Sequence, residues 1–132
     1  MLQIPDHLID AMVAHAKEVA PEECCGFLAG TSTRASELIR LRNELASPVA
    51  YSADPQSLLA AHRHMRAKGL DLVAIYHSHP GCEARPSRHD LANNYYGDIP
   101  HVIVSLIGDT PVVRAFQLSE YGFHEVGWVG PA

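Results

Sequence analysis

The stretch LDLVAIYH, residues 70–77, constrains the fold of this chain more than any other segment. It is almost wholly apolar, which is typical of a strand that is buried on both faces. Such a strand needs other strands at its edges and helices over both faces of its sheet. The chain has 132 residues, enough for one domain with little room for a second. We therefore expect a single domain over residues 1–132, built on a central sheet.

Helices and further strands are expected on both sides of this run. Apolar side chains recur at helical spacing over residues 6–19 and 55–68, and Gly69 is placed to end the second helix. The remaining elements predicted are a third helix at 87–96, strands at 24–30, 35–43, 101–107 and 111–118, and weaker strands at 49–52 and 121–128.

This order of elements predicts the fold class. Residues 24–30 and 35–43 should pair as antiparallel neighbours, and a tight turn at Gly108–Asp109 should join 101–107 to 111–118. Because helices alternate with strands in one half and strands follow one another in the other, we expect a mixed α/β (α+β) domain. Its central sheet is mixed, largely antiparallel and flanked by helices.

Charge and cysteine content disfavour several classes of protein. The formal net charge is −5 and the basic residues are scattered, so no nucleic-acid partner is expected. No stretch is apolar for the eighteen or so residues of a membrane span, and the first twenty residues lack the basic start of a signal peptide. Three cysteines cannot all pair within one chain, which favours a reduced, cytoplasmic setting.

The segment HSHPGCEARPSRHD, residues 77–90, carries the candidate chemistry. His77 and His79 lie at the end of the predicted buried strand, and residues i and i+2 of a strand face the same side. Both imidazoles could therefore bind one metal ion, with Ser78 turned away. An H-x-H pair by itself is a weak signal that also occurs by chance.

Ser87 and Asp90 follow at a spacing that has two compatible interpretations. S-x-x-D resembles a capping box at the start of a helix. The same helix start can also bring the Asp90 carboxylate to the two histidines. Two histidines and one aspartate leave the fourth position of a tetrahedral zinc ion to water, which is the arrangement of catalytic rather than structural zinc. His89, on the same helix start, should point away from Asp90 and is not expected to bind the ion.

A zinc hydrolase also needs a general base and a donor for the oxyanion. Ser87 is a candidate donor. Glu83 is a candidate base, although it lies in a loop and could be solvated. Glu23, which leads into the apolar strand at 24–30, is the better candidate because a lone carboxylate there would be costly without a role. Periodicity alone favours a solvent-facing Glu23 at the start of the strand, and its spacing from His77 does not decide between the two.

These motifs together resemble those of the JAMM or MPN+ zinc metalloproteases, which include the prokaryotic JAB domains. The matched residues are Glu23 within the pattern Pro21, Glu23, Cys25 and Gly26, followed by His77, His79, Ser87 and Asp90. The resemblance covers roughly residues 2 to 126. It implies a cytidine-deaminase-like JAB/MPN architecture. A nucleoside deaminase itself is disfavoured, because the H-x-E and P-C-x-x-C motifs are absent.

The resemblance also implies roles for the matched residues. His77, His79 and Asp90 would bind one Zn²⁺ per chain, with water as fourth ligand. Glu23 would move the proton of that water, and Ser87 would help to hold the oxyanion.

The implied substrate is a ubiquitin-like or sulfur-carrier protein, cut after its C-terminal Gly-Gly. The small bacterial members, including one that removes cysteine from a sulfur carrier, are most similar to this chain. The identity of the leaving group stays open: it could be cysteine, a short peptide or a lysine-linked protein. A homodimer is possible, and a non-catalytic MPN scaffold module is the alternative. Cys82 is interpreted as a loop thiol, although it could be a further ligand or a redox switch.

Overall fold

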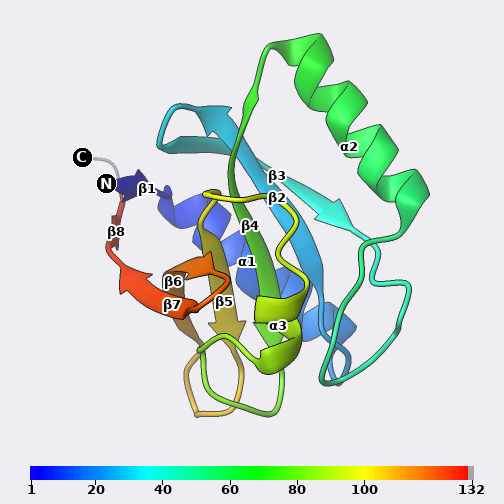
Figure 1. Ribbon diagram of the computed structural model, residues 1–132, viewed down its shortest axis with the longest axis vertical. Helices are drawn as coiled ribbons and strands as arrows, with labels where there is room; N and C mark the ends of the chain where they lie inside the picture. The colour runs from blue at the N-terminus through cyan, green and yellow to red at the C-terminus, as the bar shows by residue number, and fades with distance from the viewer. Residues whose placement is uncertain (131–132) are drawn as a thin grey trace.

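The computed structural model describes residues 1–130, which form one sheet with helices on both of its faces (Figure 1). The helices are α1 (Asp6–Val19), α2 (Pro55–Lys68) and α3 (Arg88–Ala92). The strands are β1 (Leu2–Gln3), β2 (Cys25–Thr31), β3 (Arg34–Leu41), β4 (Asp71–His79), β5 (His101–Ser105), β6 (Val112–Ser119), β7 (Gly122–Val126) and β8 (Trp128–Val129). Within the described residues, no helix has the length and apolar character needed to cross a membrane.

The strand order in the sheet is β7-β6-β5-β4-β2-β3-β1-β8. The β4 strand lies in the middle, antiparallel to β2 and parallel to β5. The β2–β3, β5–β6 and β6–β7 pairs are antiparallel, whereas β1 is parallel to both β3 and β8. The predicted mixed, largely antiparallel sheet is therefore confirmed, and so is the predicted pairing of the segments at 24–30 and 35–43.

The residues of β4 are divided between two apolar clusters, which explains why the run at 70–77 is apolar on both faces. Tyr76 faces the cluster that includes α1, behind the sheet in Figure 1. Ile75 faces the cluster that includes α2. The Tyr76 hydroxyl lies 2.7 Å from His15 Nδ1 of α1, and both side chains are buried. Tyr76 also lies against Gly26, where a Cβ would meet its ring at 2.3 Å.

Both long helices occupy their predicted bounds. Asp54 caps α2 by accepting a hydrogen bond from Ser57 N, and Gly69 ends it with a left-handed φ of 66°. The predicted third helix over 87–96 is too long, since α3 ends at Ala92. There the His89 carbonyl accepts from both the backbone N and the side chain of Asn93, a local side-chain bond of the kind that is favoured at helix ends.

Two further predictions are wrong. Residues 49–52 form no strand, because the Asn43 side chain bonds to Ala50 O and Ser52 N, the groups a strand would use. The connection between β5 and β6 is also longer than a tight turn and spans residues 106–111. Ser105 ends β5 early, since its hydroxyl donates to Cys82 O and accepts from Ile107 N.

Candidate metal centre

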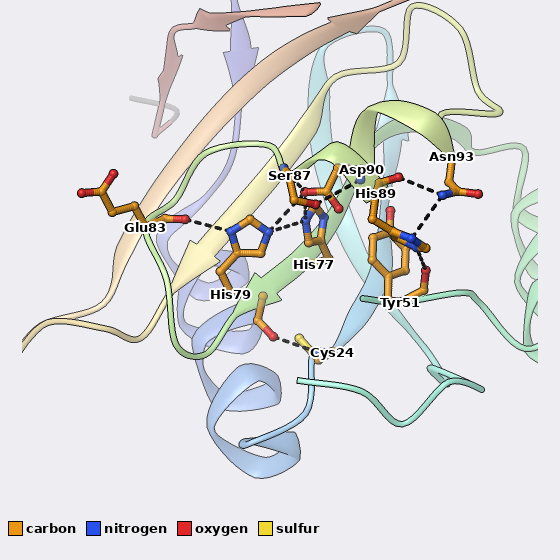
Figure 2. A network of polar contacts seen from close by, with 10 residues as sticks. Cys24, Tyr51, His77, His79, Glu83, Ser87, His89, Asp90 and Asn93 are labelled. Carbon is orange, nitrogen blue, oxygen red and sulfur yellow. Dashed lines mark hydrogen bonds and ion pairs between the residues drawn. The ribbon is translucent and has the colours of Figure 1, made fainter. Parts of the chain in front are cut away.

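Three segments that are distant in the sequence meet at the end of β4. His77 and His79 are the last alternate residues of this strand, on the side that faces α3 (Figure 2). The β2–β4 register pairs Cys25 with His77, which brings Glu23 to the same end of the sheet. Asp90 comes from the first turn of α3. One possible ligand atom from each of these four residues lies within 4.8 Å of all the others, and all four are buried.

The ligand atoms lie close enough together to share one ion. His77 Nε2 is 3.1 Å from His79 Nε2 and 3.1 Å from Asp90 Oδ2, and His79 Nε2 is 3.2 Å from the same oxygen. A tetrahedral zinc ion with ligands at about 2.0–2.1 Å holds its donor atoms about 3.3 Å apart. The three atoms therefore fit a zinc ion with little movement.

The hydrogen-bonding state of His79 supports the same conclusion. Its Nδ1 lies 2.8 Å from the carbonyl oxygen of Glu83. A carbonyl oxygen only accepts, so Nδ1 carries the hydrogen and a neutral imidazole presents a lone pair at Nε2. That lone pair faces His77 and the Asp90 carboxylate in a buried site. Only a proton or a metal ion between these atoms relieves the repulsion, and two histidines with a carboxylate are typical zinc ligands.

Neighbouring groups hold the possible ligands in place. Asp90 and Ser87 form a reciprocal capping box: Ser87 N donates to Asp90 Oδ2 at 2.8 Å, and Asp90 N donates to Ser87 Oγ at 3.1 Å. The ring of Tyr51 stacks on His77, with 4.7 Å between centroids. Glu23 Oε1, Asp90 Oδ1 and His77 Nδ1 are buried without a hydrogen-bond partner. Two of these three atoms are carboxylate oxygens, which suits a site built for a cation.

The pKa values of the two buried carboxylates shift in opposite directions. Burial raises the pKa of Glu23 to about 8. The charge of His79 lowers this pKa and the charge of Asp90 raises it, but burial is the largest effect. Burial also opposes ionisation of Asp90, but the His77 charge and the hydrogen bonds from His77, His79 and Ser87 hold its pKa well below the usual range. Asp90 is thus ionised at neutral pH, while Glu23 is able to take or give a proton there.

The structure brings all five predicted site residues together. Ser87 joins the four grouped residues through its bonds with Asp90. Glu83, the other candidate base, has an exposed side chain and contacts the site only through its carbonyl. The exposed Cys82 is not a member of the group.

His89 also lies outside the group, as the helical spacing predicts. Its Nε2 is 3.0 Å from the carbonyl oxygen of Tyr51. Tyr51 is a site residue that no pattern in the sequence indicates. It lies in an irregular segment that carries no periodic pattern.

A cavity of about 470 Å³ adjoins the grouped residues on the α2 side of the sheet. Asp90 and His89 line one wall, and Phe27, Leu58 and Tyr96 are among the apolar residues around it. The site therefore opens beside a largely apolar hollow rather than onto flat surface.

Comparison with known proteins agrees with this arrangement. Residues 5–119 match the family model described as prokaryotic homologs of the JAB domain. A probable TtuB-protein conjugate cleaving protease of Thermus thermophilus is 40% identical over 121 residues, which cover 91% of this chain and 78% of that protein. A CysO-cysteine peptidase of Mycobacterium tuberculosis is 40% identical over 107 residues, covering 80% and 73%. The solution structure of a Desulfitobacterium hafniense protein aligns with a TM-score of 0.91 at 29% identity, covering 100% of this chain and 94% of that one.

Proposed function

Because the chain belongs to the family of prokaryotic JAB-domain homologues, we propose that it is a zinc-dependent peptidase or isopeptidase of the JAMM type. Its substrate is a ubiquitin-like or sulfur-carrier protein, and the bond cut follows the C-terminal Gly-Gly. The proposal rests on one observation: the possible ligand atoms of four buried residues lie within 4.8 Å of one another, and these residues are Glu23, His77, His79 and Asp90.

Each residue of the site has a definite task in this proposal. His77 and His79 would hold the ion through Nε2, and Asp90 through Oδ2. Zinc, when bound, polarises a carbonyl and lowers the pKa of water. Glu23 takes the proton of the attacking water and delivers it to the leaving amine. Ser87 Oγ accepts from Asp90 N, so its own hydrogen is available for the oxyanion that forms on the substrate.

The relatives support the class of substrate. One is named for cleaving protein conjugates of TtuB and the other for removing cysteine from CysO. Both names describe removal of a group from a small carrier protein. We therefore propose that such a carrier binds with its Gly-Gly tail at the metal centre. The leaving group is a single amino acid, a short peptide or a lysine-linked protein, and a direct assay distinguishes the first from the last.

The test is intact-mass spectrometry of two carriers incubated with zinc-loaded protein. One carrier is extended past Gly-Gly by a single cysteine, and the other is joined through Gly-Gly to a lysine side chain. Glu23→Gln is the inactive variant, since it keeps the shape of the base and removes its ability to accept a proton. Glu83→Gln is the matched control, because that carboxylate is exposed and outside the metal group.

Loss of the extension with wild-type protein and Glu83→Gln, but not with Glu23→Gln, is the expected result. Which carrier is shortened identifies the leaving group. Absence of cleavage for both carriers, with zinc bound, would refute the proposal and favour the non-catalytic scaffold. The scaffold is disfavoured here because all four grouped residues are present and buried together.

Three further proposals complete this function. Residues 1–132 form one JAB/MPN metalloprotease domain, the protein acts in the cytoplasm, and its partner is a carrier protein rather than a nucleic acid. A homodimer stays a prediction, which the mass measured by light scattering would test.

A further inference from the structure

Both backbone groups of Glu23 are bonded to the segment at 43–53, which we call the clamp loop. Glu23 N donates to the carbonyl of Ser47 at 2.8 Å. The Glu23 carbonyl accepts from Asn43 Nδ2 at 3.1 Å. Glu23 precedes β2, so the strand ladder does not hold these two groups. The position of the Glu23 side chain therefore depends on the shape of the clamp loop.

The Asn43 side chain fixes that shape with four hydrogen bonds. Its Nδ2 donates to Glu23 O and, at 3.0 Å, to Ala50 O. Its Oδ1 accepts from Leu45 N at 3.1 Å and from Ser52 N at 3.0 Å. Two donors and two acceptors exhaust the capacity of an amide. The Asn43 amide therefore has no free donor or acceptor for a substrate. Its bonds connect distant parts of the clamp loop to each other and to Glu23.

The clamp loop also reaches the other members of the metal group. The ring of Tyr51 stacks on the ring of His77, and the Tyr51 carbonyl oxygen accepts a hydrogen bond from Nε2 of His89. His89 precedes Asp90 in α3. One loop therefore contacts Glu23, His77 and the helix that carries Asp90. It joins the proposed base to the proposed metal ligands.

We propose that Asn43 is a positioning residue, which holds the Glu23 carboxylate in register with the metal centre by bonding the Glu23 carbonyl and the clamp loop at once. The inference rests on the proposed function for its effect on catalysis, but the clamp itself is independent of any activity. Only an amide of this length supplies both pairs of bonds. The substitution Asn43→Asp would keep the two acceptor bonds and lose both donors, whereas Asn43→Ala would lose all four.

The first test is steady-state cleavage of the Gly-Gly carrier by Asn43→Asp and Asn43→Ala, with rates expressed per bound zinc so that unfolded chains do not count. Misplacement of a catalytic group by about 1 Å costs about 100-fold in rate. We expect kcat to fall about 100-fold in both variants, with KM changed less than about 3-fold, because the substituted side chain is neither a metal ligand nor part of the cavity wall. A kcat within about 3-fold of wild type in both would overturn the inference.

The matched control is Ser47→Ala. It removes the hydroxyl that accepts from Val49 N in the same loop, but it leaves the carbonyl that binds Glu23 N. Its kcat should stay within about 2-fold of wild type, since this side chain does not contact Glu23. An equal loss of kcat in Ser47→Ala would mean that any loosening of the loop is enough, and would also overturn the specific role of Asn43.

The second test needs no catalysis. Amide hydrogen exchange, resolved by NMR, should be at least about 10-fold faster at Glu23, Leu45 and Ser52 in Asn43→Ala than in wild type, and unchanged within β2. If the Glu23 amide of Asn43→Ala exchanges at the wild-type rate, Asn43 does not hold the Glu23 backbone in place. If wild-type protein cleaves no carrier, the proposed function fails, and the exchange rates still decide on the clamp.

Discussion

Acidification should destabilise this protein in part through His15, which lies in α1 behind the sheet. His15 is only 5% exposed and bonds to the Tyr76 hydroxyl at 2.7 Å. Burial, with help from the charge of Arg40, lowers its pKa from 6.5 to about 4. The folded state therefore resists protonation of an imidazole that the unfolded chain protonates readily.

The sign and size of the effect follow from this difference. Between pH 6.5 and pH 4 the unfolded chain binds more protons at His15 than the folded chain, so the free energy of unfolding falls as the pH falls. One pKa unit corresponds to about 1.4 kcal/mol, so the lowering from 6.5 to about 4 costs about 3 kcal/mol once the pH is below both values. Above pH 6.5 the contribution of His15 does not change with pH.

Urea unfolding at several pH values, for wild type and His15→Asn, measures this contribution. Asparagine can present a polar atom near the position of Nδ1 toward Tyr76 and does not titrate. Both proteins are studied with chelator, so that release of a metal at low pH does not enter the comparison. The wild type should lose about 3 kcal/mol more than the variant between about pH 7 and pH 4. Parallel curves for the two proteins would refute the assignment.

Three other outcomes follow from the geometry. Gly26→Ala should lower the free energy of unfolding by about 1–3 kcal/mol in urea titrations, because the added Cβ would lie 2.3 Å from the Tyr76 ring. Gly81→Ala is the control: no atom lies within 4 Å of its added Cβ, so the free energy of unfolding should hardly change. Ser87→Ala should lower stability by about 1 kcal/mol through the lost cap and kcat by about 100-fold, with zinc content unchanged by elemental analysis. Added zinc should raise the melting temperature in proportion to the logarithm of its concentration, and Asp90→Asn should abolish that shift in scanning calorimetry.

Much of the fold could be predicted because the elements that build it are long and regular. The two long helices have apolar faces and clear ends, and the strand at 71–79 is apolar on both faces. Elements that depend on side-chain hydrogen bonds could not be predicted. The Asn43 side chain takes backbone groups that a strand at 49–52 would have used, and the Asn93 side chain adds a second donor to the His89 carbonyl at the end of α3. The two-residue strands β1 and β8 are too short to show any period.

Some residues of the site could likewise be predicted from local sequence patterns, and others could not. The spacing of His77, His79 and Asp90 is local, so strand alternation and a helix start were enough to group them. Glu23 lies far before His77 in the sequence, and its place depends on which strands pair. The cost of a lone carboxylate beside an apolar strand made Glu23 a candidate base, but only the resemblance to a known family assigned it to this site. No pattern indicated Tyr51, since stacking on a neighbouring ring leaves no periodic signal in the sequence.

The pairing of Cys25 with His77 has a consequence for how the chain folds. A slip of one residue between β2 and β4 would turn every side chain of the slipped strand to the opposite face of the sheet. Glu23 and the two histidines would then no longer converge. If β2 is the strand that slips, the three proposed ligands His77, His79 and Asp90 still converge, because they lie on β4 and α3, but Glu23 no longer faces the ion. Metal uptake alone would therefore not distinguish such a chain from the native one, whereas hydrolysis requires the native register because only that register brings the base to the metal centre.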